Sequence, residues 1–199
     1  MNQTLSNTPR VNEDKIIEAA LVCFGRYGFQ KASMADVAKQ AQLSRTALYK
    51  YYNNKEKLFL AICDKAFSEV SEAIQLAAQI EGEPLTRLQA IFSARMLWFF
   101  KMLDYGPHGF EMIDQNHKVS GVVGSKANQK FVARIAGLFE EAEASGELAL
   151  AAQKVSPMFA AQLLVDSADG VLAETHHKDE LQQRVALLIR VFWQGLAVR

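Results

Sequence analysis

Apolar residues recur along this chain with the period of an α-helix. Near the N-terminus, Ile16, Ile17, Ala20, Leu21 and Phe24 fall on one helical face, because they are spaced by three and four. The same spacing returns over residues 58–74 and 131–142, and over residues 181–192 at offsets of 0, 4, 7 and 11. No stretch alternates apolar and polar residues in the manner of a half-buried strand. The pattern predicts an all-α protein.

Helix-start and helix-stop signals divide this pattern into about nine helices. Ser, Asn and Pro residues stand at expected starts, and glycines stand at expected ends. Asn12 is expected to cap the first helix, after a flexible tail over residues 1–11. The expected helices cover residues 13–27, 34–41, 45–51, 55–74, 84–103, 107–117 and 125–144, with two more after Ser156 separated by residues 176–178.

The two short helices near the N-terminus are predicted to form a helix-turn-helix. Ser33 and Asp36 have the spacing of a capping box, and Ser44 can cap the following helix. About three residues separate the two helices, and the longer first helix can brace them. Residues 12–53 are therefore expected to form a three-helix DNA-binding domain, and residues 54–199 a second, helical domain.

Charge is distributed unevenly, although the chain has no net charge. Residues 1–57 contain nine Lys and Arg against five Asp and Glu, which gives 9 − 5 = +4. The remainder contains thirteen against seventeen, which gives 13 − 17 = −4. A basic N-terminal part indicates a polyanionic partner for that part alone.

The stretch S-R-T-A-L-Y-K-Y-Y-N-N-K-E-K-L-F, residues 44–59, combines three of the five tyrosines with four basic residues. Leu48 and Tyr52 are expected to face the core, since they are four residues apart. Arginine can hydrogen-bond guanine with two donors, and threonine offers a hydroxyl and a methyl group. Tyrosine hydroxyls and helix N-termini bind phosphate oxygens. An isolated basic patch is more often a solvated surface, so the stretch alone leaves both interpretations open.

Four stretches together resemble one known family. They are I-I-E-A-A-L-V-C-F-G-R-Y-G-F, S-M-A-D-V-A-K-Q-A, L-S-R-T-A-L-Y-K-Y-Y and K-E-K-L-F, all within residues 15–59. In this order they are similar to the DNA-binding domain of the tetracycline-repressor (TetR) family. The resemblance implies a sequence-specific, homodimeric transcription regulator, most often a repressor, that binds a double-stranded DNA operator and is released by a small molecule.

Carried over position by position, the resemblance implies roles for individual residues. It implies that Arg45, Thr46, Ala47 and Lys50 contact bases, and that Ser33, Tyr49, Tyr51 and Lys55 contact phosphates. The family commonly has glycine in the turn at the position of Gln42. If Gln42 requires a positive φ, its side chain costs on the order of 1 kcal/mol there.

The last two helices carry more apolar residues than a helix at the end of one chain requires. An apolar face of that width indicates a subunit interface. The residues expected in a homodimer interface are Leu164, Ala168, Leu181, Val185, Leu188 and Phe192.

The middle helices contain an aromatic and thioether set suited to a small hydrophobic or planar ligand. Its members are Trp98, Phe99, Met102, Tyr105, Phe110 and Met112. Apolar pockets of this kind bind small molecules. Each of these residue types is also common in a core, so packing is the competing interpretation for every one.

Other candidate chemistry is weaker. His108, Glu111, Asp114 and His117 recur every three residues, but the outer pair would face opposite sides of a helix. A two-ligand metal site and a redox pair of Cys23 and Cys63 remain minor alternatives. No nucleophile–His–acid set, glycine-rich phosphate loop or strong metal signature is present, so neither an enzyme nor a cofactor is expected.

The N-terminus lacks the apolar segment of a secretory signal and no run is long enough for a bilayer, so we expect a cytoplasmic protein without membrane contact. An architectural or cell-cycle DNA-binding protein without an inducer is the alternative function.

Overall fold

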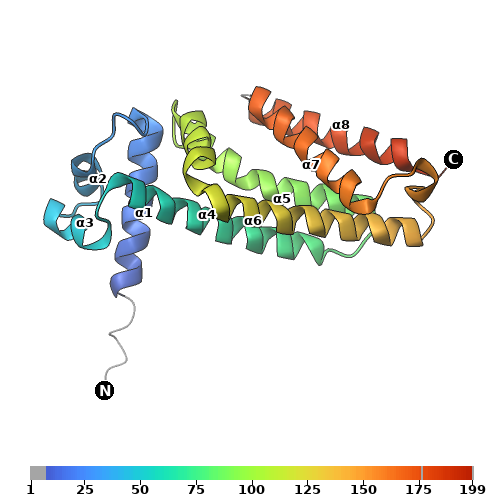
Figure 1. The fold of residues 1–199 in the computed structure, drawn as a ribbon. Coiled ribbons are helices and arrows are strands. Elements are labelled where there is room, and N and C mark those ends of the chain that lie inside the picture. Colours follow the sequence, from blue (N-terminus) through green and yellow to red (C-terminus); the bar gives the residue numbers. More distant parts are fainter. Residues whose placement is uncertain (1–7, 176, 199) are drawn as a thin grey trace, which may run out of the picture. The chain divides into compact units, whose positions relative to one another are not determined.

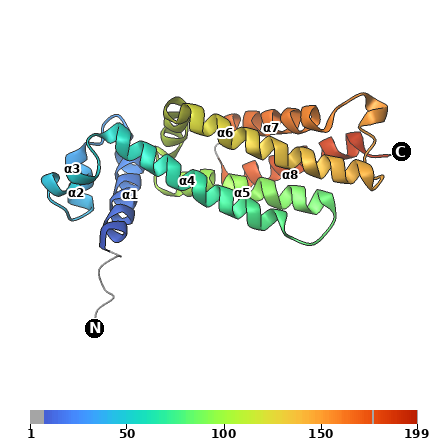
Figure 2. The ribbon, with the colours of Figure 1, turned by 60° about the horizontal axis from the view of Figure 1, so that its bottom comes forward.

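The computed structural model contains helices and no β-strand over the residues that it describes. It describes the backbone of residues 8–175 and 177–198, and their side chains except those of residues 8–11, 97, 98, 110 and 113–124. Figures 1 and 2 show the helices in chain order. They are α1 (Thr8–Tyr27), α2 (Met34–Gln40), α3 (Arg45–Tyr51), α4 (Lys55–Ala78), α5 (Pro84–Asp104), α6 (Gly109–Ala144), α7 (Pro157–Glu174) and α8 (Lys178–Leu196), with a short 3-10 helix at Ala151–Gln153. The all-α prediction is confirmed.

Two of the helices expected from the sequence are one helix in the structure. Residues 107–117 and 125–144 were expected to form separate helices, whereas α6 runs without interruption from Gly109 to Ala144. Gly121 and Gly124 lie inside it. Glycine weakens a helix by about 1 kcal/mol but leaves its N–H donor in place, unlike proline. No proline lies between Pro107 and Pro157, so the helix continues.

The first helix begins earlier than predicted. It starts at Thr8, so Asn12 lies within it and does not cap it. Pro9 is tolerated because N–H groups in the first turn of a helix have no acceptor within the helix, so the missing N–H costs no hydrogen bond. The Asn12 amide instead donates to the Tyr51 hydroxyl at 3.2 Å. Residues 1–7 of the expected flexible tail lie outside the described residues, and residues 8–11 are helical.

The chain divides into two compact units. One comprises residues 1–69 and 98–124, and the other comprises residues 70–97 and 125–199. Helices α4, α5 and α6 contribute residues to both. The boundary between residues 53 and 54, expected from the sequence, stays a prediction.

The first unit is built around an aromatic cluster. The rings of Phe24, Phe29 and Phe59 meet with centroids 5.0–6.2 Å apart, in tilted or edge-to-face contacts. All three side chains are buried, as are Leu48 of α3 and Leu58 of α4. Helix α1 packs against α2, and α2 packs against α3. The short helices α2 and α3 are therefore held by a core that α1 and α4 supply.

Helix α1 also lies against the turn between α5 and α6. A Cβ atom on Gly25 would stand 2.5 Å from the main-chain oxygen of Tyr105, so only glycine fits there. The main-chain N–H of His108 donates to the Gly25 carbonyl at 3.0 Å. The Tyr105 hydroxyl donates to Glu18 on α1 at 2.8 Å. This turn is thus joined to the first helix by main-chain and side-chain contacts.

The second unit has its own core. Phe92 of α5 meets Phe131 of α6 edge to face at 5.3 Å, and Phe139 of α6 stacks on Phe192 of α8 at 6.2 Å. Arg95 joins three helices, since it donates to Asn128 of α6 and to both carboxylate oxygens of Asp169 on α7. Helix α7 packs against α8. None of the helices in the described part of the chain has both the length and the apolar character that crossing a bilayer requires.

Candidate nucleic-acid interface

Helices α2 and α3 form the predicted helix-turn-helix, and local capping sets their ends. Ser33 accepts a hydrogen bond from the Asp36 N–H at 3.2 Å, and Asp36 accepts from the Ser33 N–H at 2.9 Å. This is the predicted capping box. Ser44 caps α3 by accepting from the Ala47 N–H at 3.1 Å. The sequence therefore located both helix starts correctly.

The turn between them contains a residue with positive φ, which is the condition considered for Gln42 from the sequence. Gln42 has φ of 57°, and Leu43 N–H donates to the Ala38 carbonyl while Gln42 N–H donates to the Lys39 carbonyl. These two bonds are the Schellman pattern that closes a helix C-terminus, in which glycine is usual at the left-handed position. The turn keeps this geometry with glutamine.

Helix α3 exposes the side chains predicted to contact bases. Leu48 is fully buried, whereas Arg45, Thr46 and Lys50 are exposed and Ala47 is half-buried. The exposed donors span about 140° of the helix, and the nearest of them, Arg45, is turned about 60° from Leu48. Two cations and a hydroxyl on one solvent-facing helical surface can hydrogen-bond base edges in a major groove.

The four residues predicted to contact phosphates differ in how free their polar groups are. Tyr49 is 42% exposed. The Tyr51 hydroxyl accepts from Asn12, and the Ser33 hydroxyl donates to Asp36 at 2.6 Å. The Lys55 ammonium donates to the carbonyl oxygens of Phe29, Gln30 and Ala32, at 2.5, 3.1 and 3.1 Å. Tyr49 and Ser33 are thus exposed, whereas Tyr51 and Lys55 are half-buried.

Both cysteines lie in this unit as free, buried thiols. Burial raises the pKa of Cys23, and burial together with the charge of Asp64 raises the pKa of Cys63 to about 12. A thiol with a raised pKa stays protonated and is a poor nucleophile. The environment of each thiol is that of a small core residue.

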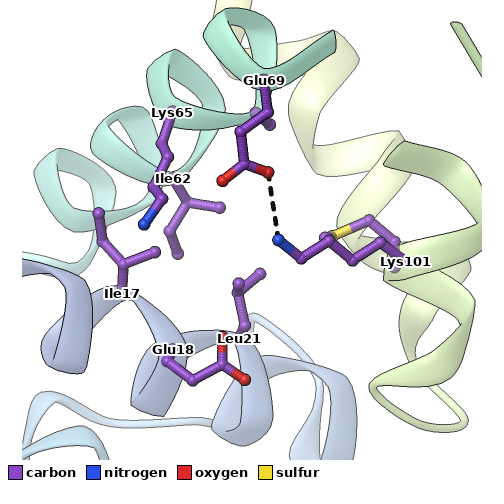
Figure 3. Close-up of a pocket in the computed structure, with 9 residues that line it drawn as sticks. Ile17, Glu18, Leu21, Ile62, Lys65, Glu69 and Lys101 are labelled. Carbon is purple, nitrogen blue, oxygen red and sulfur yellow. Dashed lines mark hydrogen bonds and ion pairs between the residues drawn. The ribbon is translucent and has the colours of Figure 1, made fainter. Parts of the chain in front are cut away.

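A small cavity lies between α1, α4 and α5 in the first unit, and Figure 3 shows its lining. Its volume is about 30 Å³, enough for about two water molecules. The Lys101 ammonium pairs with Glu69 across its edge at 3.2 Å. The lining residues are Ile17, Glu18, Leu21, Ile62, Lys65, Ala66, Glu69, Lys101 and Met102.

Among the predicted ligand-pocket residues whose side chains are described, Met102 alone lines this cavity, and the pocket stays a prediction. Met102 lines it and Met112 is fully buried, while Phe99 is half-buried. The hydroxyl of Tyr105 is bonded to Glu18, and burial raises the pKa of Tyr105. The side chains of Trp98 and Phe110 lie outside the described residues.

His108 and Glu111, from the three-residue repeat considered for metal binding, form a pair at 3.0 Å between Nδ1 and Oε2. The side chains of Asp114 and His117 lie outside the described residues. Glu111 also accepts from the Gln30 N–H at 3.4 Å, in the loop that precedes α2. Nothing in the sequence indicated that this carboxylate would reach a main-chain donor 81 positions away.

The residues predicted for the dimer interface are mostly internal. Leu164, Ala168, Leu181 and Val185 are buried within the chain itself, while Leu188 and Phe192 are half-buried. The interface set therefore stays a prediction, in which Leu188 and Phe192 are the members that keep part of their surface. The same two helices expose a different apolar set, which comprises Met158, Phe159, Leu163, Leu187 and Val191.

Comparisons with known proteins agree with this architecture. Residues 16–62 match the family of bacterial regulatory proteins called the tetR family. The chain is 28% identical over 131 residues to the transcriptional repressor SCO4008 of Streptomyces coelicolor, covering 61% of this chain and 67% of that protein. It is 24% identical over 106 residues to the transcriptional activator FasR of Mycolicibacterium smegmatis, covering 53% of this chain and 47% of FasR. The aligned region thus spans about half the length of FasR.

The fold is also similar to that of solved structures. SmeT, the repressor of the Stenotrophomonas maltophilia multidrug efflux pump SmeDEF, superposes with a TM-score of 0.69 at 17% identity, over 94% of this chain and 90% of SmeT. At this identity the likeness concerns the fold alone. The capped helix-turn-helix and the match over the same residues agree: the segment 16–62 of this chain belongs to the tetR family of bacterial regulatory proteins.

Proposed function

We propose that this protein is a sequence-specific DNA-binding transcription regulator. The observation that supports this most directly is α3, which buries Leu48 and exposes Arg45, Thr46 and Lys50. Such a helix can enter a major groove and present donors to base edges. Repression is the direction that we propose, since SCO4008 and SmeT are both repressors.

We infer that two copies act together on a pseudo-palindromic operator. Two-fold symmetry places two recognition helices about 34–36 Å apart, or a multiple of that distance, in successive major grooves. The exposed apolar side chains of Phe159 and Leu163 on α7, and of Leu187 and Val191 on α8, support a dimer contact through these helices. Apolar side chains on a shared surface favour association.

We further propose that a small hydrophobic or planar molecule releases the DNA. A ligand shifts an equilibrium only by its differential affinity for the two conformers. The cavity of about 30 Å³ is far below the roughly 300–1,000 Å³ of drug-sized sites. Ligand binding would therefore require a conformer with a larger cavity. A thermal-shift screen of apolar compounds tests this, and compounds that stabilise the protein should also lower its affinity for DNA.

The DNA-binding proposal is tested by selecting duplexes from a random library with the purified protein. Fluorescence anisotropy on the selected duplex then gives the dissociation constants of variants. Arg45→Ala should cost about 1–3 kcal/mol and relax the preference at one base pair, because one bidentate base contact is lost.

Arg134→Ala is the matched control, since Arg134 is an exposed arginine of α6 outside the helix-turn-helix. It should leave both affinity and preference unchanged. Failure to select any duplex, or equal effects of the two substitutions, would contradict the assignment of α3 as the recognition helix.

A further inference from the structure

We propose that Lys55 is a positioning residue for the helix-turn-helix, and that its ammonium does not contact the phosphate backbone. The inference rests on the proposed DNA-binding function and concerns how this chain holds its recognition helix. It replaces the phosphate contact that the family resemblance implied for Lys55.

The first observation is that every donor of the ammonium is occupied. A lysine ammonium has three N–H donors and no acceptor. Lys55 Nζ lies within hydrogen-bond distance of three main-chain oxygens, those of Phe29, Gln30 and Ala32. A phosphate oxygen could bind only by displacing one of these carbonyls.

The second observation is that the ammonium sits against an aromatic face. Its nitrogen lies 4.6 Å from the ring centroid of Phe29, within the range of a cation–π contact. Phe29 is only 3% exposed and belongs to the aromatic cluster with Phe24 and Phe59. The cation is therefore held on a rigid part of the core.

The third observation is what these contacts connect. Lys55 is the first residue of α4, whose start is capped by Asn54, which accepts from the Lys57 N–H at 2.8 Å. The three carbonyls belong to the loop between α1 and α2, and Ser33, the cap of α2, follows Ala32 directly. One side chain thus ties the start of α4 to the segment from which α2 begins.

The ammonium also satisfies groups that lack other partners. Within the described residues, no main-chain N–H donates to the carbonyls of Phe29, Gln30 or Ala32. Main-chain carbonyls in a partly buried loop are costly to leave unbonded. Loss of the ammonium should loosen the loop, shift α2, and through α2 shift the recognition helix α3.

Lysine footprinting of the unaltered protein tests this without any substitution. The probe is an amine-acylating reagent, applied with and without a random-sequence duplex at low salt, and mass spectrometry reports each lysine. In free protein, Lys55 should react at least about tenfold more slowly than the exposed Lys57, the factor that one hydrogen bond of a charged group contributes. Added DNA should leave Lys55 unchanged and should protect Lys50.

The outcomes separate the two proposals. Fast acylation of Lys55 in free protein, or new protection of both Lys55 and Lys50 by DNA, overturns the positioning role while the DNA-binding function stands. If DNA protects no lysine and no duplex is retained, the proposed function fails and this inference fails with it.

Substitutions provide an independent test, read from the DNA affinity of folded protein and its dependence on salt. If Lys55 only stabilised the fold, its substitution would change neither quantity in protein that is fully folded. Lys55→Met should weaken DNA binding at a temperature where the variant is fully folded, yet keep the slope of log affinity against log salt. Lys50→Met, the matched loss of an exposed cation on α3, should reduce that slope, because a cation that faces the DNA releases counterions on binding.

Lys55→Arg should resemble Lys55→Met, because a planar guanidinium cannot direct three donors from one point. Full affinity in Lys55→Arg together with a reduced slope in Lys55→Met would instead indicate a phosphate contact.

Discussion

Gln42 adopts the left-handed conformation that closes the turn of the helix-turn-helix. Its φ of 57° lies in the left-handed region, and its side chain is exposed. Residues with a Cβ atom pay about 1–2 kcal/mol in this region, which glycine avoids. The Schellman bonds of Gln42 and Leu43 require this conformation, so the strain is retained in the folded protein.

Gln42→Gly should therefore stabilise the protein. The relief of about 1–2 kcal/mol is partly offset by about 0.5–1 kcal/mol of added unfolded-state entropy, which leaves a gain of about 0.5–1 kcal/mol. For a chain of this size the melting temperature should rise by about 1–4 °C, as measured by circular dichroism. Gln40→Gly, an exposed glutamine inside α2, should lower it instead. If the melting temperature fell in both variants, Gln42 would be unstrained.

At the scale of the element, the short helix α2 depends on its N-terminal capping box. Asp36 accepts from both the hydroxyl and the N–H of Ser33, at 2.6 and 2.9 Å. The side-chain hydrogen bond from Ser33, followed by the main-chain one, lowers the pKa of Asp36 below its ordinary value of 3.8. A carboxylate with a lowered pKa contributes stability above its unfolded pKa, and loses it as the pH falls through the folded pKa.

The contribution of Ser33 should consequently depend on pH. Ser33→Ala should lower the melting temperature at neutral pH, and the difference from the unaltered protein should shrink below about pH 4. Ser44→Ala is the matched control, because Ser44 caps α3 by bonding Ala47 N–H without a carboxylate partner. Its effect should stay constant with pH. A constant difference for Ser33→Ala as well would mean that the Asp36 carboxylate adds nothing to the cap.

At the scale of the whole molecule, α8 has two apolar surfaces with different uses. Leu181, Val185 and Ile189 are buried in the second unit, while Leu187 and Val191 are about half exposed, at 49% and 57%. The exposed pair is spaced by four residues and so shares one face of the helix. This second surface is the one that we assign to the dimer.

Substituting both exposed residues should separate the subunits. The double variant Leu187→Asp, Val191→Asp places two carboxylates where apolar contact is proposed, so it should behave as a monomer in sedimentation equilibrium and bind operator weakly.

The control for this experiment is Ala186→Asp, at another exposed position of α8 turned about 140° from Val191. It should remain dimeric. A dimeric double variant would place the interface elsewhere, and a monomeric unaltered protein would remove the dimer from the proposal.

Local signals in the sequence were sufficient to find most helices and the motif that they build. The starts of α2, α3, α4 and α7 follow from Ser33, Ser44, Asn54 and Ser156, each of which accepts from an N–H three residues later. The family resemblance directed attention to Gln42 as a position where a left-handed conformation would matter. These features involve neighbours within one helical turn, so the order of residues alone determines them.

The tertiary structure decided which apolar residues of α8 are buried and which atoms Lys55 binds. Along α8 the sequence offers apolar residues on more than one face, and only packing against α7 and α6 buries Leu181 and Val185 and leaves Leu187 and Val191 outside. Lys55 shows the same limit, since its partners are main-chain carbonyls 23 to 26 positions away. A carbonyl oxygen is common to all residues, so nothing in the sequence marks those that a cation will bind. The chain thus encodes its helices and caps locally, whereas long-range packing selects which apolar side chains of α8 stay exposed and which carbonyl oxygens the Lys55 ammonium binds.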